Sequence, residues 1–137
     1  MSNTKVLEHV QVMVVDDNSD TCELLRIVLE QAGAAVVVAQ NIESAVEVFR
    51  KCPSHAVIAD IRIGNEDGYD LLKAIREYNA NYHGFTPTVA VTGFASPEDQ
   101  ERAKAAGFNA YIAKPFDPTE VVSTVARVLR GPTNIAA

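Results

Sequence analysis

The fold of this chain is set by one stretch near its N-terminus, Val10-Gln11-Val12-Met13-Val14-Val15-Asp16-Asp17-Asn18-Ser19. Its apolar half is rich in valine, which favours a β-strand, and its polar half consists of residues favoured at helix N-termini. In the next segment, Thr21–Ala32, apolar side chains recur at the spacing of one helical face, at Leu24, Leu25, Val28 and Leu29. The stretch therefore predicts a strand, an acidic turn and a helix.

The same alternation recurs along the rest of the chain. Further strands are expected at Ala34–Ala39, His55–Ala59, Thr88–Val91 and Asn109–Ala113, and further helices at Ile42–Phe49, at Tyr69–Tyr78, from Pro97 to the stop at Gly107, and from Pro118 to Leu129. Ile61–Gly68 is expected to be a loop and Asn79–Thr86 a polar link. Five strands alternating with five helices imply βαβ units. We therefore predict an α/β fold with a doubly wound five-stranded parallel sheet, of flavodoxin-like order 2-1-3-4-5, and five flanking helices.

Composition indicates a compact soluble protein. The chain has 137 residues, a net charge of −6, 47% apolar and 22% charged residues, which suits one domain (10–130) between a leader (1–9) and a tail (131–137). The acidic balance disfavours nucleic-acid binding, and no run of about 20 apolar residues suggests a membrane span. Met1–Glu8 lacks the features of a signal peptide, so the expected location is cytoplasmic. Cys22 and Cys52 have no partner at metal-ligand spacing and are expected to be free thiols.

Polar side chains follow four of the five expected strands. Asp16 and Asp17 follow the first strand, Asp60 the third, Thr92 the fourth and Lys114 the fifth. In doubly wound sheets, ligands bind beyond the carboxyl ends of the strands, where the strand order reverses. Because the first and third strands are neighbours in the order 2-1-3-4-5, we expect Asp17 and Asp60 to meet at that point.

Three carboxylates in one crevice repel one another, and a divalent cation such as magnesium would neutralise them. Magnesium prefers oxygen ligands and keeps several waters, which leaves room for a phosphoryl group. Asp60 can then act as a nucleophile, while the metal, the Lys114 ammonium and the Thr92 hydroxyl bind charge on the transferred phosphoryl oxygens. These residues predict a magnesium-dependent site for phosphoryl transfer.

Four motifs in chain order resemble the receiver domain of two-component response regulators, including single-domain chemotaxis-type proteins and the receivers of hybrid kinases. They are Val14-Val15-Asp16-Asp17-Asn18, Ile58-Ala59-Asp60-Ile61-Arg62-Ile63 with Asp67-Gly68, Val91-Thr92-Gly93, and Tyr111-Ile112-Ala113-Lys114-Pro115-Phe116. The resemblance spans Val10 to Arg130. It implies a phosphorylated signalling domain that catalyses only its own phosphorylation and dephosphorylation, and is otherwise not an enzyme.

The resemblance also implies a role for individual residues. Asp60 would accept the phosphoryl group from a histidine kinase or a histidine phosphotransfer protein. Asp17, Asp60 and the Arg62 backbone carbonyl would ligate Mg²⁺, and Asp16 would act through a bound water. Lys114 would contact the phosphoryl group.

A switch is implied as well. On phosphorylation the Thr92 hydroxyl would move toward the phosphate and the Tyr111 ring would turn inward. The face made by the fourth helix, the fifth strand and the fifth helix would then change its affinity for a downstream protein. The Lys114-Pro115 bond is expected to be cis. Since no DNA-binding output domain follows the last helix, output would occur through protein binding.

A few positions depart from the family pattern or tune it. Gly64 stands where proline is usual, and Gly93 stands where alanine is usual. Arg62 and Phe94 occupy positions that tune the lifetime of the phosphate. The long link Asn79–Thr86 is more like that of hybrid-kinase receivers and points to a phosphorelay.

Other readings fit the same residues. One is an interaction module that works without phosphate, although such modules usually lose the acidic pair or the lysine. Another is a magnesium-dependent phosphatase with an aspartyl nucleophile, although the chain has no obvious substrate-specificity cap. A nucleotide-binding enzyme is disfavoured because no glycine-rich phosphate-binding run follows the first strand. Taken singly, Asp16 and Asp17 could cap a helix, and Tyr111 could be an ordinary strand aromatic.

Overall fold

The computed structural model of the protein describes residues 6–63, 66–82, 84–93 and 96–130. Its helices are α1 (Ser19–Gln31), α2 (Ile42–Lys51), α3 (Gly68–Tyr82), α4 (Pro97–Ala106) and α5 (Pro118–Leu129). Its strands are β1 (Gln11–Val15), β2 (Ala35–Ala39), β3 (Ala56–Ala59), β4 (Arg62–Ile63), β5 (Glu66–Asp67), β6 (Thr88–Thr92) and β7 (Ala110–Ala113). Across these ranges, none of the helices combines the length and the apolar character that crossing a membrane requires.

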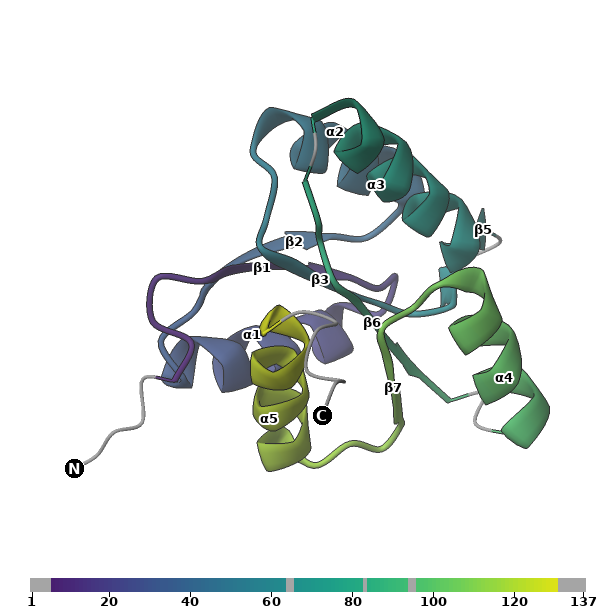
Figure 1. The fold of residues 1–137 in the computed structure, drawn as a ribbon. Helices are drawn as coiled ribbons and strands as arrows, with labels where there is room; N and C mark the ends of the chain where they lie inside the picture. The colour runs from purple at the N-terminus through teal and green to yellow at the C-terminus, as the bar shows by residue number, and fades with distance from the viewer. Residues whose placement is uncertain (1–5, 64–65, 83, 94–95, 131–137) are drawn as a thin grey trace.

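Five strands form one parallel sheet in the order β2-β1-β3-β6-β7. Counted along this sheet alone, that is the predicted order 2-1-3-4-5, so the doubly wound prediction is confirmed. Helices α1 and α5 cover one face, and α2 and α3 cover the other, with α4 beside β7 (Figure 1). The chain reverses its direction of winding between β1 and β3, and the ends of such a strand pair are where doubly wound sheets bind their ligands.

The sheet is apolar on both faces because both are covered by helices. Along β1, Val12 and Val14 pack into the core under α1 and α5, while Met13 and Val15 pack into the core under α2 and α3. All four side chains are at most 1% exposed. Burying each of them contributes about 2 kcal/mol, so β1 is held firmly from both sides. The acidic turn that follows it therefore starts from a rigid strand.

The folded part of the chain begins earlier than the predicted leader suggests. Leu7, which the sequence places within the leader 1–9, is 1% exposed and packs into the core beside α1 and α5. Its backbone N–H donates a hydrogen bond to the Ala32 carbonyl at 2.8 Å. Val6 and Leu7 are two adjacent apolar residues between polar ones, too few to show a helix or strand period, so the pattern could not signal this contact. Residues 1–5 and the tail 131–137 lie outside the described residues.

Two segments differ from the sequence prediction. The predicted loop Ile61–Gly68 contains β4 and β5, which pair antiparallel as a small second sheet. The helix predicted to end at Tyr78 continues to Tyr82, into the predicted polar link. The Tyr78 ring lies 5.2 Å from Phe49 and 4.6 Å from Tyr82, measured between ring centroids. These aromatic contacts favour helix where Asn79 and its neighbours have modest propensity, so tertiary packing decides the helix end.

Gly68, where α3 begins, lies against the backbone just after β3. A Cβ atom at this position would meet the Asp60 carbonyl oxygen at 2.5 Å and the Ile61 carbonyl oxygen at 3.0 Å. We expect Gly68→Ala to lower the free energy of unfolding by about 2 kcal/mol, because backbone atoms must shift to make room. Urea denaturation measures this loss. A matched control is Gly93→Ala, where a Cβ would meet nothing within 4 Å; an equal loss in both variants would contradict the steric explanation.

Candidate functional site

The parallel ladder brings the predicted site residues to one edge of the sheet. The Asp16 backbone N–H donates to the Ala39 carbonyl at 3.2 Å, and the Asp60 N–H donates to the Val15 carbonyl at 3.1 Å. Both aspartates therefore continue neighbouring strands by one residue. On the other side of β3, the Lys114 N–H donates to the Thr92 carbonyl at 2.9 Å. The carboxyl ends of β1, β3 and β7 thus bring Asp16, Asp60 and Lys114 together. It is Asp16 that lies beside Asp60 through Lys114, whereas Asp17, which the sequence predicts to meet Asp60, is exposed in the turn after β1.

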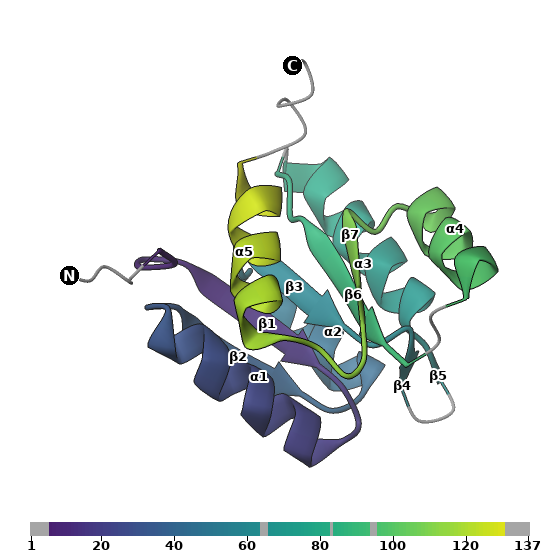
Figure 2. The same ribbon diagram turned by 90° about the horizontal axis from the view of Figure 1, so that it is seen from below.

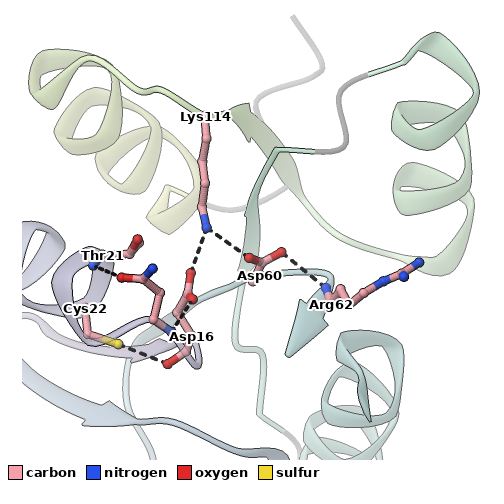
Figure 3. A network of polar contacts seen from close by, with 7 residues as sticks. Asp16, Thr21, Cys22, Asp60, Arg62 and Lys114 are labelled. Atoms are coloured by element: carbon pink, nitrogen blue, oxygen red, sulfur yellow. Dashed lines mark hydrogen bonds and ion pairs between the residues drawn. The ribbon is translucent and has the colours of Figure 1, made fainter. Parts of the chain in front are cut away.

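The Lys114 ammonium joins two carboxylates at this edge. Its Nζ atom lies 3.0 Å from Asp16 Oδ2 and 3.0 Å from Asp60 Oδ2 (Figure 3). The carboxylate side chains are 3% and 11% exposed, and that of Lys114 is 26% exposed. Charge-assisted hydrogen bonds are strong where water is largely excluded, so this triad is a fixed feature of the site.

Backbone donors orient the second oxygen of each carboxylate. Asp16 Oδ1 accepts a hydrogen bond from the Asn18 N–H at 2.9 Å. Asp60 Oδ1 accepts from the Arg62 N–H at 3.2 Å. Each carboxylate therefore has one oxygen on a backbone N–H and the other on Lys114. The two carboxylates are therefore held beside each other. The Oδ2 atoms of both face the Lys114 ammonium.

Burial and charge shift the pKa values of this cluster. Burial raises the pKa of Asp16 above its ordinary value, and the hydrogen bonds from Asn18 and Lys114 only partly offset that effect. Burial of the Lys114 ammonium by itself lowers the pKa of that group, but the hydrogen bonds to Asp60 and Asp16 outweigh it, so the pKa of Lys114 is raised. The ammonium is therefore charged throughout the neutral range.

The residues present fit a magnesium ion in their chemistry. Asp16 and Asp60 already share one cationic group, the Lys114 ammonium. The side-chain atoms that these two residues could offer to a metal ion are all oxygens, the ligand atoms that magnesium prefers. Asp17 is exposed in the same turn, and Arg62 follows Asp60 in β4. Within the described ranges the structure brings together no group of three or more Asp, Glu, His or Cys side chains at metal-binding geometry. The expected ligand set, with two carboxylates and a backbone carbonyl, is smaller than such a group and needs water to complete it.

The two predicted switch residues lie on neighbouring strands. Thr92 ends β6 and is fully buried. Tyr111 lies on β7 opposite Ala90 and packs with Phe108 and Ala103. Its hydroxyl is buried and has no hydrogen-bond partner within the part of the chain that the structure describes. Burial raises the pKa of this hydroxyl, which stays protonated at neutral pH. Tyr111 is thus partly exposed as a residue, while the polar end of its ring is enclosed.

The structure describes some of the positions that follow, depart from or tune the family pattern. The Lys114-Pro115 bond is cis, as expected. Gly93 has open space where an alanine Cβ would lie. The Arg62 side chain is exposed. Gly64 and Phe94 lie outside the described residues.

The sequence did not predict that Cys22 contacts the backbone of the acidic turn. The Cys22 thiol is buried and donates to the Asp16 backbone carbonyl at 3.2 Å (Figure 3). Burial, together with the negative charge of Asp16, raises the pKa of this thiol to about 11. The helical spacing places Cys22 in α1, but only the fold shows that it reaches back to the acidic turn.

The two cysteines are expected to differ in reactivity. Only the thiolate attacks a disulfide reagent, so Cys22, with its pKa of about 11, stays largely protonated at pH 8. Cys52 is exposed. Titration of the native protein with an aromatic disulfide reagent should give one fast thiol, and the second only after unfolding. A Cys52→Ser variant should lose the fast phase, whereas two equally fast thiols would contradict this assignment.

The comparisons with known proteins agree with this geometry. The protein-family model for the response regulator receiver domain matches residues 12–126 of this chain. The chain is 31% identical to the chemotaxis protein CheY of Halobacterium salinarum over 119 residues, which cover 87% of this chain and 96% of that protein. It is 29% identical to the polar-differentiation response regulator DivK of Brucella anthropi, over 86% of this chain and 94% of that one. The solved structure of the Vibrio cholerae chemotaxis protein CheY4 superposes with a TM-score of 0.79 at 29% identity, covering 87% and 98% of the two chains.

Fold and site together define a doubly wound α/β protein with two aspartates and a lysine clustered at the carboxyl edge of its sheet. The chain belongs to the response regulator receiver domain family. Receiver domains are signalling domains of two-component systems, and accepting a phosphoryl group is their general function. Members of the family generally bind Mg²⁺ and interact with histidine kinases or phosphotransfer proteins.

Proposed function

We propose that this chain accepts a phosphoryl group on Asp60 from a histidine kinase or a histidine phosphotransfer protein. The observation that carries the proposal is the position of the Asp60 carboxylate, which follows β3 at the switch point and lies 3.0 Å from the Lys114 ammonium. A carboxylate that is 11% exposed is reachable by a phosphodonor yet shielded from most water. The cytoplasm is the compartment that this partner requires, because the kinase is charged by ATP.

The proposed reaction moves one phosphoryl group between two side chains. An Asp60 oxygen forms a bond to phosphorus while the bond from phosphorus to the donor's imidazole nitrogen breaks, and that nitrogen keeps the electron pair. The Lys114 ammonium lies beside the new acyl phosphate and compensates charge on its oxygens. Thr92, at the end of the neighbouring strand, supplies a hydroxyl to the same group. The Arg62 N–H keeps the carboxylate oriented for attack.

Magnesium would be held by Asp17, Asp60 and the Arg62 backbone carbonyl, with Asp16 acting through a bound water. When bound, this ion neutralises the phosphoryl oxygens and the aspartates that surround them. The chain's own contribution is to hold Asp16 and Asp60 in place through their backbone donors. The chain would catalyse only its own phosphorylation and dephosphorylation.

The proposed output is a change in protein binding at the face made by α4, β7 and α5. The support is the location of Tyr111, whose strand β7 ends next to Lys114 and whose ring packs with α4 residues such as Ala103. A shift of Thr92 toward the phosphoryl group would alter the space beside that ring. Phosphorylation would then favour one of two arrangements of α4, which a downstream protein distinguishes.

Intact-mass measurement tests the proposal. The protein is incubated with a small acyl phosphate donor and Mg²⁺, and we expect the mass to rise by one phosphoryl group. The gain should be lost when a chelator removes the metal, because the acidic site then repels the donor. A folded protein that gains no mass with Mg²⁺ would contradict the proposal and favour an interaction module that works without phosphate. Many turnovers of the donor per site would instead favour a phosphatase.

A further inference from the structure

The small sheet after the acceptor strand is attached to helix α2. Strands β4 and β5 pair antiparallel, with Arg62 opposite Asp67 and Ile63 opposite Glu66. Figure 2 shows this pair as a projection beside the carboxyl ends of the main strands. The pair is joined to Asp60 at its start and to α3 at its end, where the Gly68 N–H donates to the Ile61 carbonyl. Its position therefore affects where the residues next to Asp60 lie.

One side chain links this pair to a distant part of the chain. Glu66 Oε1 accepts a hydrogen bond from the Ile42 backbone N–H at 3.1 Å, in a part-buried position. Ile42 is the first residue of α2, so its N–H is one of the donors that a helix leaves without an internal partner. A carboxylate at a helix N-terminus is also favoured by the helix dipole. The Asn41 side chain caps the Ser44 N–H, so Glu66 satisfies a different donor of the same helix end.

The cross-strand neighbour of Glu66 supports the same attachment. Ile63 is 1% exposed and belongs to the same core cluster as Ile42 and Ala39. The pair of short strands is thus joined to the N-terminus of α2 by a charge-assisted hydrogen bond through Glu66, and Ile63 shares a core cluster with the first residue of that helix. Next to Ile63 on β4, Arg62 directs its N–H to Asp60 Oδ1. A continuous series of contacts therefore runs from α2 through the small sheet to the Asp60 carboxylate.

We propose that Glu66 is a positioning residue for the acceptor site, which holds Arg62 against Asp60 by joining β4 and β5 to the N-terminus of α2. The proposal rests on the proposed function of Asp60 and the Arg62 carbonyl. Glu66 itself touches neither the phosphoryl group nor the metal. Its effect is transmitted through the β4–β5 pairing, and groups behind the ligands of a metal commonly set their orientation.

Amide hydrogen exchange of the metal-free protein tests this role directly. In Glu66→Ala, the N–H groups of Ile42 and Arg62 should both exchange about tenfold faster, the factor that follows from losing one net hydrogen bond. Glu66→Gln keeps an acceptor oxygen and should restore slow exchange at both sites. The matched control is Glu43→Ala, which removes an exposed carboxylate from the first turn of the same helix. That control should leave the exchange of Arg62 unchanged.

The outcomes separate a positioning residue from a simple helix cap. Faster exchange at Ile42 alone, with Arg62 unchanged, would overturn the proposal and leave Glu66 as a cap of α2. Equal effects in Glu66→Ala and Glu43→Ala would overturn it too, because they would reflect only the lost charge. A second readout is the Mg²⁺ dissociation constant from amide shifts, expected to rise up to about tenfold in Glu66→Ala. A wild type without any Mg²⁺ response would contradict the proposed function, while the exchange of Arg62 would still decide the role of Glu66.

Discussion

An Asp60→Asn variant is expected to gain no phosphoryl mass when it is incubated with a phosphodonor and Mg²⁺. The amide oxygen of asparagine is a much weaker nucleophile than a carboxylate, so the rate should fall by at least about 10³-fold. The amide keeps an acceptor for the Arg62 N–H, which holds Asp60 in the native protein. The fold should therefore survive, because the change removes the reactive group and little of the packing.

The control for this variant is an aspartate of the same loop. Asp67 is exposed and accepts a hydrogen bond from the Tyr69 N–H, at the start of α3. Asp67→Asn should be phosphorylated like the wild type, since its carboxylate accepts from the Tyr69 N–H at 2.9 Å and lies across the small sheet from Arg62. Full phosphorylation of Asp60→Asn, with the mass on Asp16 or elsewhere, would contradict the assignment of the acceptor.

Lys114→Met is expected to give the largest loss of stability in the site. Methionine fills a similar volume but leaves the carboxylates of Asp16 and Asp60 next to each other without the cation that lies 3.0 Å from both. Breaking a buried pair costs about 3–5 kcal/mol, and because Lys114 is 26% exposed we expect a smaller loss of about 2 kcal/mol. Urea denaturation at neutral pH measures the change.

The loss should depend on pH in a defined direction. The pKa of Lys114 is raised above its ordinary 10.5, so its contribution to stability is present at neutral pH and disappears as the pH rises through the folded value. The pKa of Asp16 is also raised above its ordinary 3.8, and it should rise further without Lys114. Below pH 3.8 this carboxyl is protonated in both states. The difference between wild type and Lys114→Met should therefore be greatest near neutrality and narrow toward both extremes.

Magnesium provides an independent measurement on the same variant. If the ion binds among these carboxylates, it should raise the melting temperature of Lys114→Met more than that of the wild type, because it replaces the missing cation. A matched control is Lys104→Met, which removes a lysine from the last turn of α4. Lys114→Met melting as the wild type does, with or without Mg²⁺, would show that the ammonium does not stabilise the aspartate pair.

The sequence predicts most of the fold because its signals are local. Short apolar runs identify each strand of the main sheet, and Asn18, Asn41 and Asp117 cap helices α1, α2 and α5 as their side chains suggest. The order of the strands, 2-1-3-4-5, is one of the common orders of doubly wound sheets, and the structure confirms it. The residues of the site are predictable for the same reason, since they come directly after the strands.

The sequence could not predict contacts whose partners are far apart along the chain. Leu7 carries no periodic pattern, yet it fills the core beside α1 and α5. The end of α3 at Tyr82 depends on ring packing rather than on helix propensity. Glu66 reads as an ordinary loop carboxylate until the fold brings it to the Ile42 N–H, 24 residues away.

For this protein, the sequence by itself determined which side chains lie at the carboxyl edge of the sheet, because strand ends are local features and parallel strands end at one edge. Only the tertiary structure decided how those side chains meet. Lys114 lies 98 residues from Asp16 and 54 from Asp60, and no local pattern fixes where its ammonium points. The position of the Lys114 ammonium between the two aspartates exists only in the folded chain. The raised pKa of Asp16 likewise arises only when folding buries its carboxyl group.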